Sequence, residues 1–559
     1  MSTSEYDAIV IGAGHNGLTC ACYLAKAGLK VVVIEQYYSI GGMTITEEVT
    51  LPGFKSDVHA FGYQLANLSP VPKELNLENW GFELIRPEIS YSHIFPKDTG
   101  LGYIAMYRDI SKTLKSIQRY SKKDAKVWNK LFDKYKAQRD SIVSSINSPP
   151  TSSNPSAYNQ GNETEGIIES FTEYRIALQS MRSWCDEWFE TEEVKVMFGT
   201  FASFVGLSPD DAGGGELSFL FASVMQDCGN NVVRGGFGNL PNSLAKYLES
   251  KGGQVITNLG VEKIIIKNSR ATGVKLDNGK KIAAKKLVAS STDPSTLILK
   301  HIGEDYLEKP IIEKVKKIEW GDAIMAIYLA LNDAPEYYAG AKVSDSSQVH
   351  LSGNTIDSFA KTYYQCRSRI LPSDPLAIMS NDSACDPSRV PQGKHLIKFL
   401  ILNVPYKIKE FESDGVSGRI MMRNSPSRKT RSNSQHWSEY IKEHYADYLI
   451  NMITQKYMPN LKKIMIKKVV FSPIDFETRP STSVRGTLAC GALVPYQKYS
   501  MRPIPELAGY KVNSIPNIYL CGSGSHPGPG VSMAPGRNAA QVIFANLNLD
   551  FSKIVAERY

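Results

Sequence analysis

The sequence predicts an α/β fold, in which a parallel sheet is built from separate pieces of the chain and a second, α+β unit lies between those pieces. Two observations indicate this. A β-α-β pattern opens the chain at residues 6–35, and a further strand–loop–helix pattern closes it at 517–547. A third compact unit of one helix and four strands spans 235–294. Alternating strands and helices of this kind are typical of parallel sheets covered by helices.

The opening unit carries a glycine-rich turn, Gly12-x-Gly14-x-x-Gly17, between a short apolar strand and a helix. A second apolar strand follows and ends at Glu35, 21 residues after Gly14. This is the spacing of a dinucleotide-binding turn: Gly12 permits the tight turn, Gly14 lets a pyrophosphate approach, and Gly17 lets the helix pack closely. The Glu35 carboxylate can accept hydrogen bonds from a ribose and would repel a 2′-phosphate, which argues against NADP.

The middle unit begins with the turn Gly235-Gly236-Phe237-Gly238 and continues as a helix over 243–251. The sequence Asp277-Asn278-Gly279 is a hairpin signal between its last two strands. We expect the four strands at 254–257, 261–267, 271–276 and 281–289.

The closing unit has a strand at 517–522, a loop rich in glycine and proline through Gly530, and a helix that starts at Val531 or Pro535 and runs to Leu547. The N-terminus of this helix can stabilise negative charge on a bound ligand. Gly41-Gly42, six residues after the second strand, offers another close backbone approach and suits a cofactor longer than NAD.

Composition excludes several classes of protein. With 42% hydrophobic and 21% charged residues, the chain is neither collagen-like, coiled-coil nor wholly disordered. No apolar run reaches the roughly 18 residues of a membrane-spanning helix; the longest, at 323–331, fits a buried strand. The eight cysteines form no CxxC pair and suggest a reducing compartment. The first residues resemble no secretory signal, and we expect a cytoplasmic protein with no metal site.

The net charge of +8 gathers partly in two segments outside the predicted nucleotide-binding unit. Residues 112–139 hold ten Lys or Arg and two acidic residues, with apolar residues at helical spacing. This pattern fits either an amphipathic helix on a membrane surface or a domain helix with a basic, solvated face. Residues 144–166 and the basic segment 419–431 read as loops. Nucleic-acid binding is not required by this charge.

Three stretches resemble the phytoene desaturase–carotenoid ketolase superfamily of FAD-dependent oxidoreductases, in particular the branch that holds flavoproteins with a pyridine nucleotide–disulphide oxidoreductase domain. They are DAIVIGAGHNGLTCACYLAKAGLKVVVIEQYYSIGG, TEEVTLPGFKSDVHA and YLCGSGSHPGPGVSMAPGRNAA. The resemblance implies a Rossmann-type FAD-binding domain of the amine-oxidase-like (GR2) class with an interleaved α+β substrate domain. The implied FAD-binding residues are Gly12, Gly14, Asn16, Gly17, Glu35, Gln36, Gly41, Gly42, Met43, Val261, Gly522, Gly530, Val531 and Ser532.

The discontinuous FAD-binding domain is then expected at 1–90, 226–300 and 480–559, and the substrate domain at 91–225 and 301–479. The sequence departs from related patterns at three positions. Met43 stands where amine oxidases often carry Arg, and Ser523 where they carry an acidic residue. Pro529 interrupts the usual glycine run and removes a backbone donor.

The resemblance implies removal of a hydride from a hydrophobic, carotenoid- or isoprenoid-like substrate to flavin N5, with dioxygen or a quinone as electron acceptor. Candidate acid–base residues are His526, Asp57 and His59, each of which also suits a structural role. Phe198, Phe201 and Phe204 can line a substrate tunnel or form core. Two alternatives stay open: a flavin amine or amino-acid oxidase, and a non-enzymatic binder of prenylated partners like the GDP-dissociation inhibitors.

Overall fold

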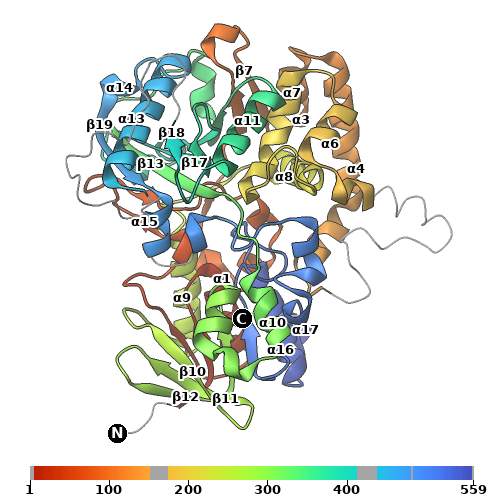
Figure 1. The fold of residues 1–559 in the computed structure, drawn as a ribbon, viewed down its shortest axis with the longest axis vertical. Coiled ribbons are helices and arrows are strands. Elements are labelled where there is room, and N and C mark those ends of the chain that lie inside the picture. Colours follow the sequence, from red (N-terminus) through yellow and green to blue (C-terminus); the bar gives the residue numbers. More distant parts are fainter. Residues whose placement is uncertain (1–4, 151–173, 412–436, 480–482, 557–559) are drawn as a thin grey trace, which may run out of the picture.

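The structure, a computed structural model, describes residues 5–150, 174–411, 437–479 and 483–556. The chain forms two lobes, each built on a seven-stranded sheet, and passes between them several times (Figure 1). In these described residues, no helix is both long and apolar enough to cross a membrane.

The lower lobe in Figure 1 holds the sheet that the terminal patterns predict. Five of its strands are parallel, in the order β20, β12, β1, β2, β9, and β10 and β11 form an antiparallel meander that joins β12. The predicted strands are confirmed to within a residue or two. Their bounds are β1 (Glu5–Ile11), β2 (Val31–Ile34), β9 (Gln254–Ile256), β10 (Val261–Lys267), β11 (Arg270–Leu276), β12 (Lys281–Ser290) and β20 (Ile518–Leu520).

Both faces of this sheet are buried, as parallel sheets require. Along β1, Ala8 and Val10 pack on one side, while Ile9 and Ile11 pack on the other. The first side is covered by α1 (His15–Lys26), α9 (Asn239–Ser250) and α16 (Ala534–Asn546). The second side meets the β10–β11 meander, a π-helix at Thr296–Ile302 and α10 (Lys309–Lys316).

The upper lobe contains a mainly antiparallel sheet in the order β19, β13, β17, β16, β14, β6, β7. Strand β13, between β19 and β17, is the predicted apolar run, and all nine of its residues are buried. The bounds are β6 (Ile89–Ile94), β7 (Tyr103–Tyr107), β13 (Ala323–Leu331), β14 (Gln348–Leu351), β16 (Ala377–Ser380), β17 (His395–Val404) and β19 (Met465–Phe471).

Helices cover both faces of this second sheet. Met325 and Ile327 pack with α13 (Glu439–Lys456), whereas Ala326 and Tyr328 face a large aromatic cluster on the opposite side. The helices of that cluster are α3 (Ile110–Gln118), α4 (Lys122–Ile146), α6 (Met181–Trp188), α7 (Glu192–Gly199), α8 (Gly214–Cys228) and α11 (Ile356–Arg367).

The remaining elements are short. The helices are α2 (Val71–Glu74), α12 (Asp382–Cys385), α14 (Leu461–Ile464), α15 (Pro473–Thr478) and α17 (Phe551–Ala556). Three two-stranded pairs join β3 (Thr46–Glu47) with β4 (Ser56–Asp57), β5 (Leu84–Ile85) with β8 (Val232–Val233), and β15 (Ile370–Leu371) with β18 (Glu410–Phe411).

The basic segment 112–139 is not one helix, as the sequence suggested, but parts of α3 and α4. The side chain of Ser121 accepts a hydrogen bond from the backbone N–H of Asp124, which caps α4 and starts a new helix. The apolar side of α4, including Trp128 and Tyr135, is buried in the aromatic cluster. An apolar face that is already inside the protein is not free to enter a membrane.

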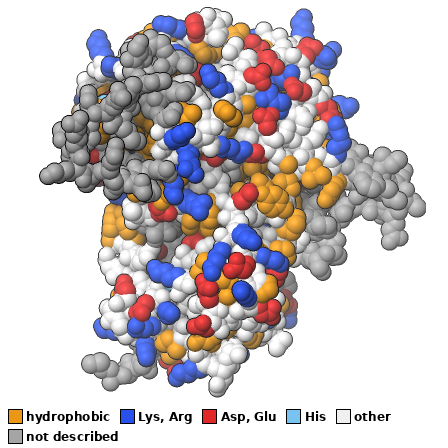
Figure 2. Space-filling model, in the orientation of Figure 1, with side chains coloured by type: hydrophobic (Ala, Val, Ile, Leu, Met, Phe, Trp, Pro, Cys, Tyr) orange, Lys and Arg blue, Asp and Glu red, His pale blue; other side chains and the backbone are white. Residues whose placement is uncertain are grey.

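The predicted loop at 144–166 begins later than expected, because α4 continues to Ile146, and most of it lies outside the described residues. The predicted basic loop at 419–431 lies wholly outside them. On the face drawn in Figure 2, acidic and basic side chains are interspersed over the lower lobe, so the net positive charge forms no single-sign patch there.

Helix α16 packs on α1 at a distance that only glycine allows. A Cβ at Gly536 would lie 2.1 Å from the backbone oxygen of Asn16. We therefore expect Gly536→Ala to force the two helices apart and to destabilise the protein by about 1–3 kcal/mol, the usual cost of overpacking. Thermal unfolding measures this.

Gly509→Ala is the matched control, because a Cβ at Gly509 has no neighbour within 4 Å. An equal effect of the two substitutions would show that the α1–α16 contact has no special role.

Candidate functional site

The glycine-rich turn lies at the carboxyl end of β1 and leads into α1. Gly12 has a φ of +93°, and a Cβ there would meet Ser291 Oγ at 2.5 Å. A Cβ at Gly17 would meet the Gly12 oxygen at 2.2 Å. At Gly14, by contrast, an added Cβ would meet no described residue beyond its chain neighbours closer than the Gly41 oxygen, at 4.0 Å. Protein packing explains glycine at 12 and 17, whereas at 14 the space is open.

The N-terminus of α1 is buried but has no protein cap. Gly14 occupies the N-cap position without a side-chain hydrogen bond, and the first turn carries no acidic residue. His15 and Asn16 are buried, and neither His15 Nδ1 nor Asn16 Oδ1 has a hydrogen-bond partner in the described structure. Burial lowers the pKa of His15 to about 4, so the ring is neutral at neutral pH. Open backbone N–H groups at a buried helix start are suited to an anion such as a pyrophosphate.

Glu35 lies beside this turn. Its carboxylate accepts hydrogen bonds from the backbone N–H groups of Ala13 (2.8 Å) and Tyr37 (2.9 Å). Burial raises the pKa of Glu35, and these hydrogen bonds oppose the rise. A carboxylate has about four lone-pair sites, so Glu35 retains acceptor capacity for a ribose hydroxyl.

The fold brings the start of β10, at Val261, close to Glu35 and Gln36, although these residues are far apart in the sequence. The Leu259 N–H donates to the Glu35 oxygen at 3.0 Å, and the Asn258 N–H donates to the Tyr37 oxygen at 2.9 Å. A Cβ at Gly260 would lie 3.6 Å from the Cβ of Gln36. The start of β10 therefore lies beside the end of β2, where the resemblance expects the adenosine part of a cofactor.

Gly41 and Gly42 lie on the other side of the glycine-rich turn. We call the backbone of this turn and of the double glycine the cradle. The Gly41 N–H donates to the Ala13 oxygen at 2.9 Å, and Gly41 and Gly42 both have positive φ, +119° and +56°. The half-buried Met43 accepts a hydrogen bond from the Ala60 N–H through its backbone oxygen, at 3.2 Å. Gly12, Gly14, Gly41 and Gly42 thus line one continuous strip of backbone.

Ser291 directly follows β12 and lies between the glycine-rich turn and the C-terminal loop. It is not among the residues that the sequence predicts. Ser291 Oγ donates to the backbone oxygens of Ile11 and Gly12, each at 3.1 Å. A Cβ at Gly522 would meet the Ser291 oxygen at 2.4 Å. Ser291 is therefore the contact between the first strand and the last, and no sequence motif marks it.

Helix α16 starts at Ala534, one residue before Pro535, the later of the two predicted starts. Gly530, Val531 and Ser532 lie in the preceding loop, where Val531 has a φ of +56°. A positive φ at a β-branched residue is strained and often marks a functional site. A Cβ at Gly530 would meet Leu65 at 3.0 Å, and Ser532 Oγ accepts a hydrogen bond from the Ala534 N–H at 3.3 Å.

The three candidate acid–base residues have contacts that explain them structurally. His526 Nε2 lies 2.9 Å from the Ser145 oxygen, an acceptor, so Nε2 carries the proton. Burial lowers its pKa to about 4. His59 packs against Phe476, and burial lowers its pKa to about 3. Asp57 forms a buried ion pair with Arg389, at 2.9 Å. Their catalytic roles stay predictions.

Asp57 belongs to a buried ionic cluster that joins the two lobes. Arg389, with no exposed side-chain surface, also approaches Asp382 at 3.5 Å and donates to the Lys55 oxygen. Lys398, on β17, donates to the backbone oxygens of Asp57 (2.8 Å) and Ala60 (2.5 Å). Burial lowers the pKa of Lys398 to about 8.

The nucleotide-binding side reaches the same cluster. Asp57 accepts a hydrogen bond from the Phe237 N–H (2.7 Å), and Asp386 accepts one from the Gly235 N–H (2.6 Å), both just before α9. These contacts fix the position of the predicted turn 235–238 against the upper lobe.

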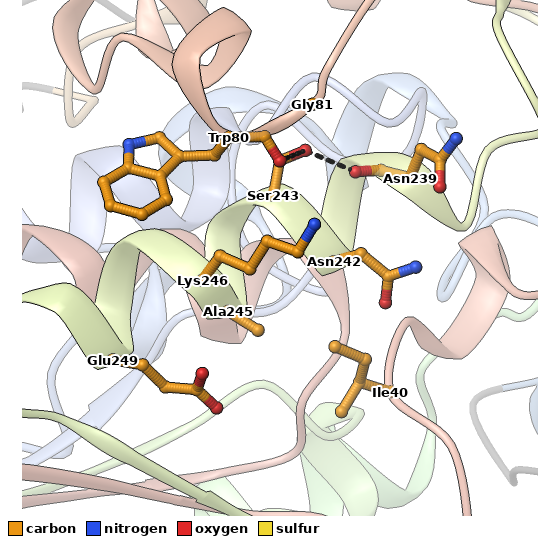
Figure 3. A pocket seen from close by; sticks show the side chains of 9 residues that line it. All are labelled: Ile40, Trp80, Gly81, Asn239, Asn242, Ser243, Ala245, Lys246 and Glu249. Carbon is orange, nitrogen blue, oxygen red and sulfur yellow. Dashed lines mark hydrogen bonds between the residues drawn. The ribbon is translucent and has the colours of Figure 1, made fainter.

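A pocket of about 300 Å³ lies outside this cradle, against the exposed side of α9 (Figure 3). Ile40, which precedes the double glycine, forms one wall, and Trp80 and Lys246 form others. Ser243, in the same pocket, donates to the Asn239 oxygen at 2.7 Å. Most of its polar lining residues are exposed, and none of the candidate cofactor residues lines it.

Comparison with known proteins supports this assignment of the fold. A family model described as an NAD(P)-binding Rossmann-like domain matches residues 10–74. Pyridine nucleotide-disulfide oxidoreductase domain-containing protein 2 of Mus musculus is 26% identical over 577 residues, which cover 97% of this chain and 94% of the mouse protein. A limonene dehydrogenase subunit of Castellaniella defragrans is 26% identical over 98% of this chain and 96% of its own length. Phytoene desaturase of Fusarium fujikuroi is 24% identical over 95% and 87%.

Solved structures agree on the fold. An oxidoreductase from Methanosarcina mazei has a TM-score of 0.58 and 15% identity, covering 97% of this chain and 99% of its own. Putrescine oxidase with bound putrescine has a TM-score of 0.59 and 14% identity, covering 98% and 100%. The resemblance to the phytoene desaturase-like superfamily and the Rossmann-like, amine-oxidase-like fold are both confirmed.

We expect Arg389→Met to lower the free energy of unfolding by about 3–5 kcal/mol, because it removes the guanidinium that pairs with the buried Asp57 and approaches Asp382. Urea denaturation measures this. Lys112→Met is the control: it breaks the Lys112–Glu88 pair, whose side chains are half exposed, and such pairs contribute about 0–1 kcal/mol. Similar losses in both variants would contradict a special role for the buried cluster.

Proposed function

We propose that the protein is an FAD-dependent oxidoreductase that removes a hydride from a hydrophobic, isoprenoid-like substrate. The observation that carries the proposal is the open, uncapped start of α1 at Gly14, beside the acceptor Glu35. The full-length relatives support it, since their names include a limonene dehydrogenase subunit and a phytoene desaturase.

The residues of the cradle fit FAD, and we propose which parts they hold. Glu35, Gln36 and Val261 would bind the adenosine, and the turn with Gly14 and Asn16 the pyrophosphate. Gly41, Gly42 and Met43 would follow the ribityl chain, with the loop of Gly522, Gly530, Val531 and Ser532 at the flavin. We propose FAD and not NAD because the start of α16 and the strip at Gly41 and Gly42 offer binding surface beyond the first turn. We propose that residues 1–90, 226–300 and 480–559 form the FAD-binding domain and that residues 91–225 and 301–479 form the substrate domain. The presence of two separate sheets supports this proposal.

When bound, FAD supplies the acceptor for the hydride. The protein residues then have to orient the substrate and exclude water, which suffices for such chemistry without a nucleophile. In the described residues no group of three or more His, Cys, Asp or Glu could hold a metal ion.

Aromatic side chains supply the apolar walls that such orientation needs. Phe61, which follows the cradle, contacts Phe204 at a ring distance of 5.3 Å, and Phe204 contacts Phe201 at 5.5 Å. Phe198, Phe201 and Phe204 are all buried in the cluster beside the cradle. We propose that part of this cluster borders the substrate. Figure 2 shows hydrophobic side chains gathered near the junction of the two lobes, a surface suited to a lipophilic molecule.

An amine substrate is the second possibility that the fold permits. The putrescine oxidase similarity, at 14% identity, shows the fold alone.

The proposed electron acceptor is dioxygen or a quinone. Contact with a membrane, if the basic face of α4 makes it, would be electrostatic, because the apolar face is buried.

We expect Gly14→Val to abolish FAD binding without unfolding the protein. Gly14 has ordinary extended backbone, φ −66° and ψ 162°, and a Cβ there would lie 4.0 Å from the Gly41 oxygen, so the protein has room for a side chain where we place the pyrophosphate. FAD content of the purified protein and thermal unfolding of the apoprotein measure the two effects.

Gly17→Ala is the contrasting variant, since its Cβ would clash with the Gly12 oxygen. It should lose both FAD and thermal stability. A Gly14→Val protein that keeps stoichiometric flavin would refute the site, and a native protein that binds no FAD would refute the proposed function.

The substrate class is tested by anaerobic mixing with carotenoid, monoterpene, fatty-acyl and amine compounds, followed by the visible absorbance of the flavin. We expect bleaching with an isoprenoid. Bleaching by amines alone would establish the amine oxidase alternative instead.

A further inference from the structure

Arg502 is a fully buried cation without an acidic partner in the described parts of the chain. Only 1% of its surface is exposed. Its guanidinium donates to backbone oxygens alone. They are Gly491 (3.1 Å), Ala492 (3.4 Å) and Gln497 (3.4 Å) from Nη1, and Ala489 (3.0 Å), Cys490 (3.1 Å) and Ser523 (2.9 Å) from Nη2.

An uncompensated buried charge destabilises the folded protein. Arg389, the other fully buried arginine of the described residues, is paired with Asp57 and approaches Asp382. Burial lowers the pKa of Arg502 to about 10, which still leaves the guanidinium charged at neutral pH. Carbonyl dipoles offset part of the cost, but they do not cancel a full positive charge.

The guanidinium is aimed at the loop between β20 and α16. Its Nε has no hydrogen-bond partner among the described residues, although it is buried. A Cβ at Gly528 would lie 3.3 Å from that Nε. Ser523, at the start of the same loop, accepts from Nη2. Arg502 therefore lies against this loop at two points, with one N–H unused.

A purely structural role would explain the bonds to carbonyl oxygens, which hold residues 489–497 against the loop. It would not explain why the group is charged, because neutral amide side chains also donate to carbonyls. The Nε–H of Arg502 has no acceptor and its charge has no acidic partner among the described residues. Both observations point instead to an anion that a bound ligand supplies.

We propose that Arg502 stabilises the negative charge that the FAD site gains on reduction, and thereby raises the midpoint potential of the bound cofactor. The inference rests on the proposed function. Transfer of a hydride breaks a substrate C–H bond and delivers two electrons and one proton, so one net negative charge enters the site. The substrate is oxidised and keeps the matching positive charge until it loses a proton. Arg502 acts through its positive charge alone and keeps its proton throughout.

The test is the midpoint potential of bound FAD, measured by slow anaerobic reduction against reference dyes. We expect Arg502→Gln to weaken binding of reduced relative to oxidised FAD at least tenfold, which for a two-electron couple lowers the potential by about 30 mV. Arg502→Lys keeps the charge and should stay closer to the parent protein. Lys314→Gln is the control, since it removes a surface charge paired with Glu506.

A structural role alone would lower thermal stability and FAD content in both Arg502 variants but leave the potential of the retained flavin unchanged, and that result overturns the proposal. If Arg502→Gln fails to fold, the native protein decides: a potential above that of free FAD supports the proposal, and one below it refutes it. A native protein without FAD refutes the proposed function itself, before any potential is measured.

Discussion

The lower lobe depends on a contact around Ser291 at which three distant parts of the chain meet without room for a Cβ. Ser291 bonds to the oxygens of Ile11 and Gly12, and Gly522 packs on its backbone. Gly536 then brings α16 onto the Asn16 oxygen. Because interiors are close-packed, these approaches leave no freedom in the relative position of β1, β12, β20 and α16. The open position at Gly14 exists only because its neighbours are fixed this way.

A second constraint joins this lobe to the upper sheet. Residues 56–60 run between the lobes, with Asp57 paired to Arg389 and with Lys398 bound to the oxygens of Asp57 and Ala60. Tyr328, on β13, donates to the Val58 oxygen at 2.5 Å. Buried charges need partners with good geometry, so this cluster tolerates little movement of one lobe against the other. A cofactor that extends from the turn to the junction would then meet walls of fixed shape.

The electrostatics of the junction are asymmetric. Of the buried arginines described, Arg389 has carboxylate partners, while Arg502 contacts carbonyl oxygens only. Neutral, buried histidines such as His59 and His526 add no positive charge at neutral pH. The charge of Arg502 lies next to the loop from Gly528 to Met533, which leads into α16. In this loop the non-glycine residues Val531 and Met533 have positive φ.

The sequence by itself determined the local elements: the glycine turn, Glu35 at the end of β2, the hairpin at 277–279 and the buried strand β13. Each depends on residues close together in the chain, so periodicity and spacing suffice. Tertiary structure alone decided that α4 turns its apolar side inward, that the later of the two predicted starts of α16 is the right one, and that Ser291, Gly536 and Arg502 meet the site. Those features depend on contacts that leave no local pattern in the sequence. Ser291 meets Gly12 and Gly536 meets Asn16 from hundreds of positions away, and Arg502 meets the Ser523 oxygen 21 positions along the chain.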